Sequence, residues 1–194
     1  MENKEPGSEP ILNLIGEKVA LGPIRRDLVP LYQRWINDLE VTRTLSAGHR
    51  PTTFEAESEW YEHSAGSGRP QFTIYERATL RPIGNTGWLD LDSGNRTAEL
   101  GIMIGEKDCW NRGYGTEAVR LMLEYGFTVL NLHSAFLRHV AYNGRGHRAY
   151  EKAGFRVIGR RRESVFWAGR SHDMVYMDCL ASEFQGEALR HLRE

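Results

Sequence analysis

The spacing of apolar residues divides the chain into amphipathic helices and short strands. Between residues 26 and 39, apolar side chains recur every three or four positions, which is the period of a helix with one buried face. Leu28, Leu31, Tyr32, Trp35, Ile36 and Leu39 form this stripe. Helical spacing also predicts helices over residues 54–61, 113–130, 147–153 and 181–192.

Alternating or uniformly apolar runs between these helices predict strands. They cover residues 19–24, 71–75, 82–90, 97–104, 135–142, 155–159, 165–167 and 172–179. Asp92-Ser-Gly-Asn95 supplies the turn chemistry of a hairpin between two of them. The mixture of strands and helices indicates an α/β protein with one domain over residues 13–184. We expect residues 1–12 to be disordered and residues 185–194 to form a tail or short helix.

Composition excludes several classes of function. The 194 residues are 40% hydrophobic and 26% charged, as expected for a globular domain, and the net charge of −1 indicates neither a nucleic-acid nor a membrane partner. Cys109 and Cys179 lie too far apart in sequence to indicate a disulfide framework or zinc site, and the histidines show no metal-ligand spacing. From this spacing we expect no metal site. We find no signal-peptide pattern, so we expect a cytoplasmic protein.

The most informative segment is residues 110–118, Trp-Asn-Arg-Gly-Tyr-Gly-Thr-Glu-Ala, directly before a predicted helix. Gly113 and Gly115 let the backbone approach a ligand closely, and free amides at a helix start bind phosphate. No Walker loop is present, and Gly113, Gly115 and Ala118 match a dinucleotide fingerprint only weakly. Alone, the segment is also compatible with a glycine cap before an ordinary core helix.

A second motif follows at residues 143–155, Asn-Gly-Arg-Gly-His-Arg-Ala-Tyr-Glu-Lys-Ala-Gly-Phe. Together the two segments resemble motifs A and B of the GNAT (Gcn5-related) N-acetyltransferases. Trp110 departs from the Gln or Arg that usually opens motif A, and Gly146 replaces the usual Ala of motif B. The tryptophan resembles the branch of Rim-type ribosomal-protein and polyamine acetyltransferases.

This resemblance implies a mixed sheet that is splayed where acetyl-CoA enters and flanked by helices. It also implies that acetyl-CoA is a co-substrate, bound by the strand before motif A and by the two motifs. The expected contacts are Ile102, Met103, Ile104, Asn111, Arg112, Gly113, Tyr114, Gly115, Thr116, Asn143 and Lys152. In this view the amide of Met103 would donate to the thioester oxygen.

Each of these contacts has an ordinary structural alternative. The strand side chains and Tyr114 can be core residues, and Asn143 can cap a turn. Arg112 and Lys152 can be solvated. Both readings of a residue can hold together, because a backbone amide can bind a cofactor while its side chain packs inward.

Transfer of an acetyl group to an amine requires a base for the amine, donors for the oxyanion and an acid for the thiolate. Glu99 is our candidate base, because a carboxylate is unusual in the apolar segment Ala98-Glu-Leu-Gly-Ile-Met-Ile104 and the family often places a base there. The alternative is a carboxylate paired with an arginine. Tyr150 matches the acid of the family motif, and the alternative is simple packing.

The sequence gives fewer signals for the acceptor site than for the cofactor site. The resemblance implies that the two N-terminal helices wall its cleft, and Trp35, Asn37 and Trp88 are the predicted contacts. We expect a primary amine to attack acetyl-CoA directly in a ternary complex. The most favoured acceptor is a protein N-terminus, followed by a polyamine and then an aminoglycoside-like compound. A non-catalytic acyl-CoA sensor is the alternative class, and a homodimer is left open.

Overall fold

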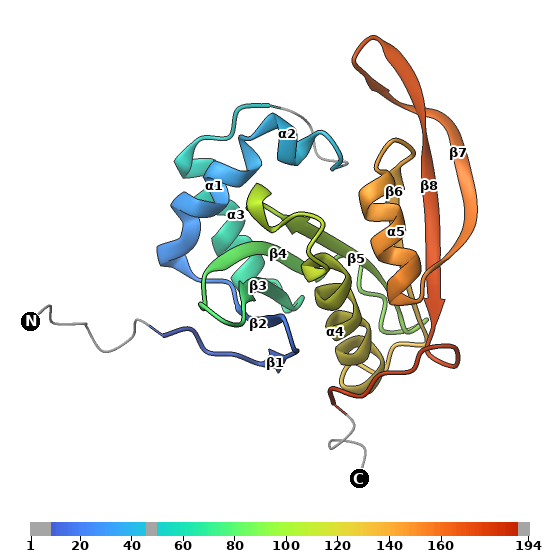
Figure 1. The fold of residues 1–194 in the computed structure, drawn as a ribbon, viewed down its shortest axis with the longest axis horizontal. Helices are drawn as coiled ribbons and strands as arrows, with labels where there is room; N and C mark the ends of the chain where they lie inside the picture. Colours follow the sequence, from blue (N-terminus) through green and yellow to red (C-terminus); the bar gives the residue numbers. More distant parts are fainter. Residues whose placement is uncertain (1–8, 46–49, 190–194) are drawn as a thin grey trace, which may run out of the picture.

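The computed structural model describes residues 9–45 and 50–189. Residues 1–8, part of the segment expected to be disordered, lie outside this description, and residues 9–12 have no regular secondary structure. The described strands form one sheet in the order β1-β2-β3-β4-β5-β6-β8-β7 (Figure 1). They are β1 (Leu14–Ile15), β2 (Val19–Pro23), β3 (Gln71–Glu76), β4 (Pro82–Trp88), β5 (Thr97–Ile104), β6 (Ser134–Val140), β7 (Arg156–Trp167) and β8 (Arg170–Leu180).

The sheet is antiparallel except between β5 and β6, and there it separates. These two strands pair only from Thr97 opposite Ser134 to Glu99 opposite Phe136. From residue 100 to Ile104, β5 keeps β4 as its only partner among the described strands. The predicted splayed sheet is therefore present, and it leaves one backbone edge of β5 open.

The register of β4 on β5 determines which backbone groups face that open edge. Leu89 N donates to Glu99 O at 2.7 Å, and Gly105 N donates to Ile83 O at 2.9 Å. In an antiparallel pair, alternate residues turn their N–H and C=O groups to opposite sides. The odd-numbered residues of β5 therefore face β4, while Leu100, Ile102 and Ile104 face the open edge.

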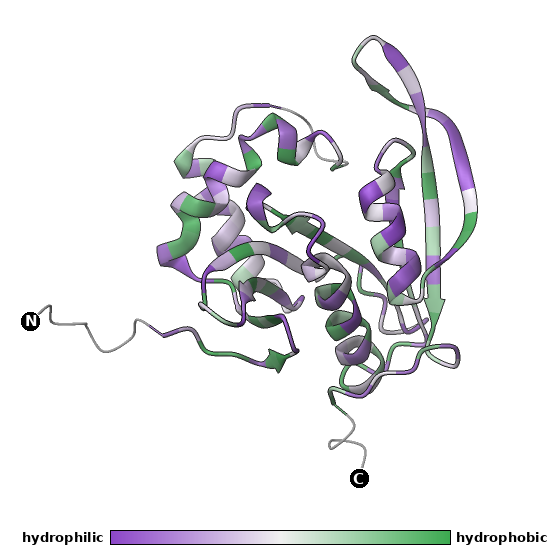
Figure 2. Cartoon of the chain, viewed as in Figure 1, coloured by the Kyte–Doolittle hydropathy of each residue, from purple (hydrophilic) through white to green (hydrophobic). Residues whose placement is uncertain are grey.

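Helices cover both faces of the sheet. They are α1 (Val29–Ile36), α2 (Leu39–Thr42), α3 (Phe54–Gly66), α4 (Tyr114–Thr128) and α5 (Gly144–Ala153), with single 3-10 turns at Arg26–Leu28 and Lys107–Cys109. The predicted stripe of α4 buries Ala118 and Met122 in the main core with Leu100 of β5. Tyr32 and Trp35 of α1 form a smaller cluster with Met103 on the other face. Apolar residues accordingly concentrate on the central strands and α4 (Figure 2).

The predicted helix over residues 26–39 is wrong in its continuity. It divides into a 3-10 turn, α1 and α2, because Asp38 adopts an extended conformation and accepts hydrogen bonds from Glu40 N and Val41 N. This side-chain capping starts a new helix where the apolar period alone predicts an uninterrupted one.

The predicted C-terminal helix is also wrong over its described part. Residues 181–189 form turns and irregular chain, and residues 190–192 lie outside the described ranges. The buried Glu124 carboxylate of α4 accepts hydrogen bonds from Ala188 N at 3.0 Å and Leu189 N at 2.7 Å. A tertiary contact thus takes the amides that helical spacing would assign to a local helix.

The C-terminal strands differ from prediction in length. The two predicted segments 155–159 and 165–167 are one strand, β7, whose register against β8 shifts twice. The β7–β8 hairpin extends beyond the other strands (Figure 1). The two-residue β1 is too short to give a sequence pattern.

Candidate active site

A cavity of about 700 Å³ lies where the sheet separates. Its walls come from α1–α3 on one side and from β6 and α5 on the other, with β4, β5 and the β5–α4 loop between them. Of the predicted site residues, those that line the cavity are Glu99, Ile102, Met103, Ile104, Asn111, Gly113, Tyr114, Gly115, Thr116, Asn143, Tyr150 and Lys152. The two sequence motifs and the strand before them therefore meet at one place.

The β5–α4 loop leaves the first amides of α4 free at this cavity, and we call them the anion cradle because free N–H groups at a helix start suit an anion. Gly113 precedes α4 with φ +86°, a left-handed conformation, and no side chain caps the helix there. The amides of Tyr114, Gly115 and Thr116 belong to the first turn, so they have no acceptor within the helix. They also lie at the positive end of the helix dipole. A Cβ added at Gly113 would meet only the flexible end of Lys18, at 3.3 Å from Nζ, so the left-handed backbone is the main constraint on this position.

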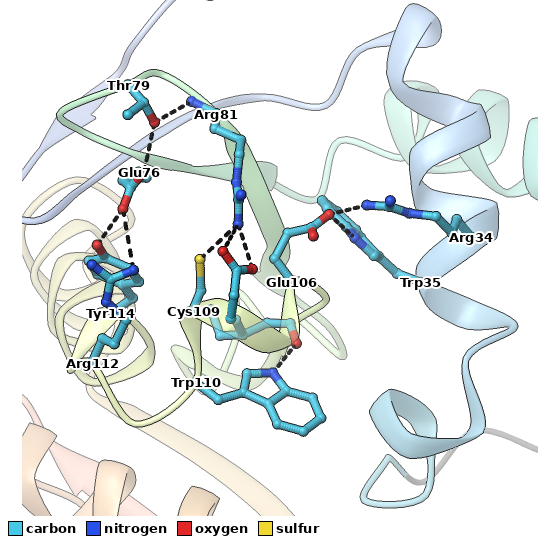
Figure 3. Close-up of polar contacts among 12 residues, drawn as sticks. Arg34, Trp35, Glu76, Thr79, Arg81, Glu106, Cys109, Trp110, Arg112 and Tyr114 are labelled. Carbon is cyan, nitrogen blue, oxygen red and sulfur yellow. Dashed lines mark hydrogen bonds and ion pairs between the residues drawn. The ribbon is translucent and has the colours of Figure 1, made fainter.

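Trp110, the departure from the usual first position of the motif, anchors this loop. Its indole N–H donates to the Ile104 carbonyl at 2.9 Å (Figure 3). The Arg145 guanidinium of α5 lies 3.7 Å from the centre of the Trp110 ring. The tryptophan thus connects β5 and α5 across the loop and uses the Ile104 carbonyl, which leaves Ile102 to present both of its backbone groups at the open edge.

The expected role of the Met103 amide is therefore corrected by the register. Met103 lies opposite Asn85 of β4, and its N–H faces that strand. The neighbouring Ile102 is the residue whose N–H faces the open edge. Periodicity predicts the strand but not which of its two edges will be left without a partner.

At the start of α5, Asn143 acts as the helix cap. Its Oδ1 accepts a hydrogen bond from Gly146 N at 2.9 Å, which is the alternative role recognised from the sequence. A Cβ at Gly146 would lie 2.5 Å from Asn143 Nδ2. The glycine that departs from the family motif therefore leaves room for this capping side chain, which also borders the cavity.

Glu99 is 5% exposed and lies at the point where β5 and β6 part. Arg138 Nε lies 2.9 Å from Glu99 Oε1. Burial raises the pKa of the Glu99 carboxyl above its ordinary value, and the positive charge of Arg138 opposes that rise. The arginine-paired alternative is therefore present, and the paired carboxylate also borders the cavity.

Tyr150 of α5 packs its ring 5.7 Å from that of His139 and 6.3 Å from that of Phe155. Its hydroxyl makes no hydrogen bond with any residue in the described parts of the chain. Burial raises its pKa to about 12, so the phenol stays protonated at neutral pH. It is therefore a free hydrogen-bond donor at the cavity.

Residues 18–156 match the family model of the acetyltransferase (GNAT) domain. The chain belongs to the GNAT family. It is 33% identical over 98 residues to the putative ribosomal N-acetyltransferase YdaF of Bacillus subtilis, covering 50% of this chain and 53% of that protein. It is 28% identical over 130 residues to spermidine N(1)-acetyltransferase of Vibrio cholerae, covering 67% and 74%. The chain thus spans about half the length of the first relative.

The structural comparison agrees with the GNAT fold. Spermidine N-acetyltransferase from Vibrio cholerae, solved with CoA and spermine, superposes with a TM-score of 0.80 at 23% identity. The match covers 87% of this chain and 98% of that one. GNAT enzymes are N-acetyltransferases that use acetyl-CoA, and the anion cradle and open edge of β5 fit that co-substrate. Within the described residues, no cluster of metal-ligating side chains occurs and no helix is long and apolar enough to cross a membrane.

The three predicted acceptor contacts do not line the cavity of this GNAT domain. Trp35 is 2% exposed, and its indole N–H donates to Glu106 at 2.8 Å (Figure 3). Asn37 exchanges hydrogen bonds with the backbone of Thr52. Trp88 is fully buried against α4 near Gly126. The aromatic residues chosen as acceptor contacts are core residues, and the structure provides no support for their predicted role.

Arg112 is also absent from the cavity lining. Its guanidinium lies 5.3 Å from the centre of the Tyr114 ring and 4.0 Å from Glu76, on the outer side of the loop. Lys152 does line the cavity. Of the two basic side chains proposed to contact phosphate, only Lys152 borders the cavity.

The sequence analysis did not identify two polar residues that line the cavity on α3 and β4. Glu57 and Asn85 both line it, as does the ring of Trp60, which lies 5.9 Å from Tyr32. Glu57 lies in a strongly polar helical segment with a weak amphipathic pattern, so its burial gives no signal in the sequence. Asn85 lies in a strand whose sequence does not indicate which face of the sheet borders the cavity.

Proposed function

We propose that this protein transfers the acetyl group of acetyl-CoA directly to a primary amine while both substrates are bound. The observation that carries the proposal is the meeting, in one cavity, of the anion cradle, the open edge of β5, the Glu99 carboxylate and the Tyr150 hydroxyl. When bound, acetyl-CoA supplies the activated acetyl thioester. A sensor would need the cradle but not a paired base and acid.

Three groups of the chain have distinct roles in this proposal. Glu99 takes a proton from the acceptor ammonium, which must be neutral to attack, and Arg138 favours the ionised carboxylate that can do so. The Ile102 N–H donates to the carbonyl oxygen as negative charge develops there. Tyr150 donates its hydroxyl hydrogen bond to the departing sulfur. Because its pKa is about 12, above that of a thiol at about 8.5, it supports the thiolate mainly as a hydrogen-bond donor.

For the acceptor we propose a small cationic polyamine, which reverses the order expected from the sequence. The relatives named spermidine N(1)-acetyltransferase from Vibrio cholerae and Escherichia coli match over 74% and 89% of their lengths, whereas the ribosomal relative matches over 53%. The cavity lining supports the same choice, because it includes Glu57, Trp60 and Tyr32. A carboxylate and aromatic faces are suited to an alkylammonium ion.

The test is release of free CoA thiol from acetyl-CoA in the presence of spermidine, spermine, a peptide with a free N-terminus, an aminoglycoside or a free amino acid. We expect turnover with the polyamines and little with the others. Turnover confined to the peptide would reinstate the protein N-terminus as the acceptor. Tight CoA binding without turnover on any amine would contradict the proposed reaction.

The Glu99–Arg138 pair gives a pH prediction. The ionised carboxylate accepts the proton, so the rate rises as pH increases through the pKa of Glu99. Arg138 lowers that pKa against the effect of burial, so Arg138→Gln should raise it and move the acid limb of kcat/KM to higher pH. The profile is measured beside Arg156→Gln, which removes a 2.7 Å ion pair with Glu183 outside the cavity lining. An unmoved acid limb in Arg138→Gln would exclude Glu99 as the base.

A further inference from the structure

Glu57 of α3 is a buried carboxylate without a protein partner. It is 7% exposed and makes no hydrogen bond or ion pair with any residue in the ranges 9–45 and 50–189. Burial raises its pKa. A buried charge that is not paired costs free energy, so such a group needs a partner from outside the chain or a reason to be tolerated. Glu57 borders the cavity, which gives a ligand access to it.

Asn85 of β4 is a second unsatisfied group in the lining of the same cavity. Both polar atoms of its side chain, Oδ1 and Nδ2, are buried and have no hydrogen-bond partner. In register it lies between Thr73 of β3 and Met103 of β5. Asn85 lines the cavity, and because both polar atoms are buried in this structure, its amide reaches a ligand there by turning its side chain.

Two glycines of paired strands lie between Asn85 and Glu99 on the sheet surface. Gly87 and Gly101 lie directly opposite each other there, and Gly101 is two residues from both Met103 and Glu99. Residues 99, 101 and 103 share one face of β5, so the row of Asn85 and the row of Glu99 are about 13 Å apart along the strand. Asn85 and Glu99 therefore mark two separate positions along the cavity lining, and the side chains of Gln71 and Leu89 lie over the glycines between them.

We infer that Glu57 and Asn85 form a subsite for a second ammonium group of the acceptor, remote from the amine that reacts beside Glu99. The carboxylate supplies charge, the amide oxygen supplies a hydrogen-bond acceptor, and the Trp60 ring supplies an aromatic surface. The subsite selects extended amines with at least two positive charges over monoamines. This inference rests on the proposed acetylation of cationic amines at the same cavity.

The experiment compares Glu57→Gln with the unmodified protein on spermidine and on butylamine, a monoamine. We expect kcat/KM for spermidine to fall roughly 10- to 100-fold, as for loss of a charge-assisted hydrogen bond, and kcat/KM for butylamine to stay unchanged. Asn85→Leu should show the same selectivity with a smaller loss. The matched control is Glu59→Gln, an exposed carboxylate on the same helix, which should change neither value.

Two further readouts separate this inference from the proposed function. The melting temperature of Glu57→Gln should be unchanged or higher, because the substitution removes a buried unpaired carboxyl; a selective loss then cannot come from unfolding. Calorimetric binding of spermidine to the CoA-loaded protein tests the subsite without turnover. Binding that weakens in Glu57→Gln supports the subsite even where no amine is acetylated. Equal losses on both amines, or no loss on spermidine, would overturn it.

Discussion

Gly113→Val should reduce affinity for CoA by roughly 100-fold or more, because several charge-assisted hydrogen bonds from the α4 amides would be lost together. The Gly113 backbone has φ +86°, a conformation that a β-branched residue rarely adopts, so the valine would shift the backbone that presents these amides. Affinity is measured by calorimetry with CoA.

Backbone strain alone must be separated from loss of the cradle. Gly169 at the β7–β8 turn has φ +79°, and a Cβ there would meet nothing within 4 Å. Gly169→Val therefore imposes the same left-handed strain on a β-branched residue, about 1–2 kcal/mol, far from the cavity. It should lower stability and leave CoA affinity intact. Unchanged affinity in Gly113→Val would place the phosphate site elsewhere.

Tyr150→Phe should lower kcat roughly 100-fold while leaving CoA affinity nearly unchanged, since the phenol is proposed to act on the departing sulfur and not on cofactor binding. The ring contacts with His139 and Phe155 remain available to phenylalanine, so the packing of α5 should persist. Steady-state turnover and calorimetric CoA binding measure the two effects separately.

Tyr176→Phe is a suitable control, because the residue lies on β8 and does not line the cavity. The pH profile adds a second check. With a pKa of about 12, Tyr150 stays protonated throughout the neutral range, so the unmodified enzyme should show no loss of rate below pH 10 that depends on this residue. A kcat for Tyr150→Phe equal to that of the unmodified enzyme would remove Tyr150 from the acid role.

Local sequence signals predicted the elements beside the cavity well. The helix start at Gly113 and the buried stripe of α4 each depend on neighbouring residues and on intrinsic backbone preference, and both occur as expected. The strand over residues 97–104 also has its predicted bounds. Such features are readable because a glycine conformation or an apolar period is fixed within a few residues.

The acceptor side could not be read in the same way. Large aromatic residues such as Trp35 and Trp88 occur both in cores and in binding clefts. Only the packing of Trp35 against Gly105 and of Trp88 against Gly126 shows that both are core residues. Glu57 lies in a segment with the composition of a solvated helix face, and its burial depends on how α3 packs on the rest of the fold, including α1. The break at Asp38 and the clamp by Glu124 show the same limit, because one capping or tertiary hydrogen bond overrides the local period.

By itself, the sequence determined that the chain forms an α/β domain with a glycine-bracketed helix start and a candidate base and acid, because these follow from local spacing and motif order. Only the tertiary structure decided that β5 parts from β6 after Glu99, that Ile102 rather than Met103 faces the open edge, and that Glu57 and Asn85 line one cavity. Those outcomes depend on strand register and on contacts between distant segments, which local patterns do not specify.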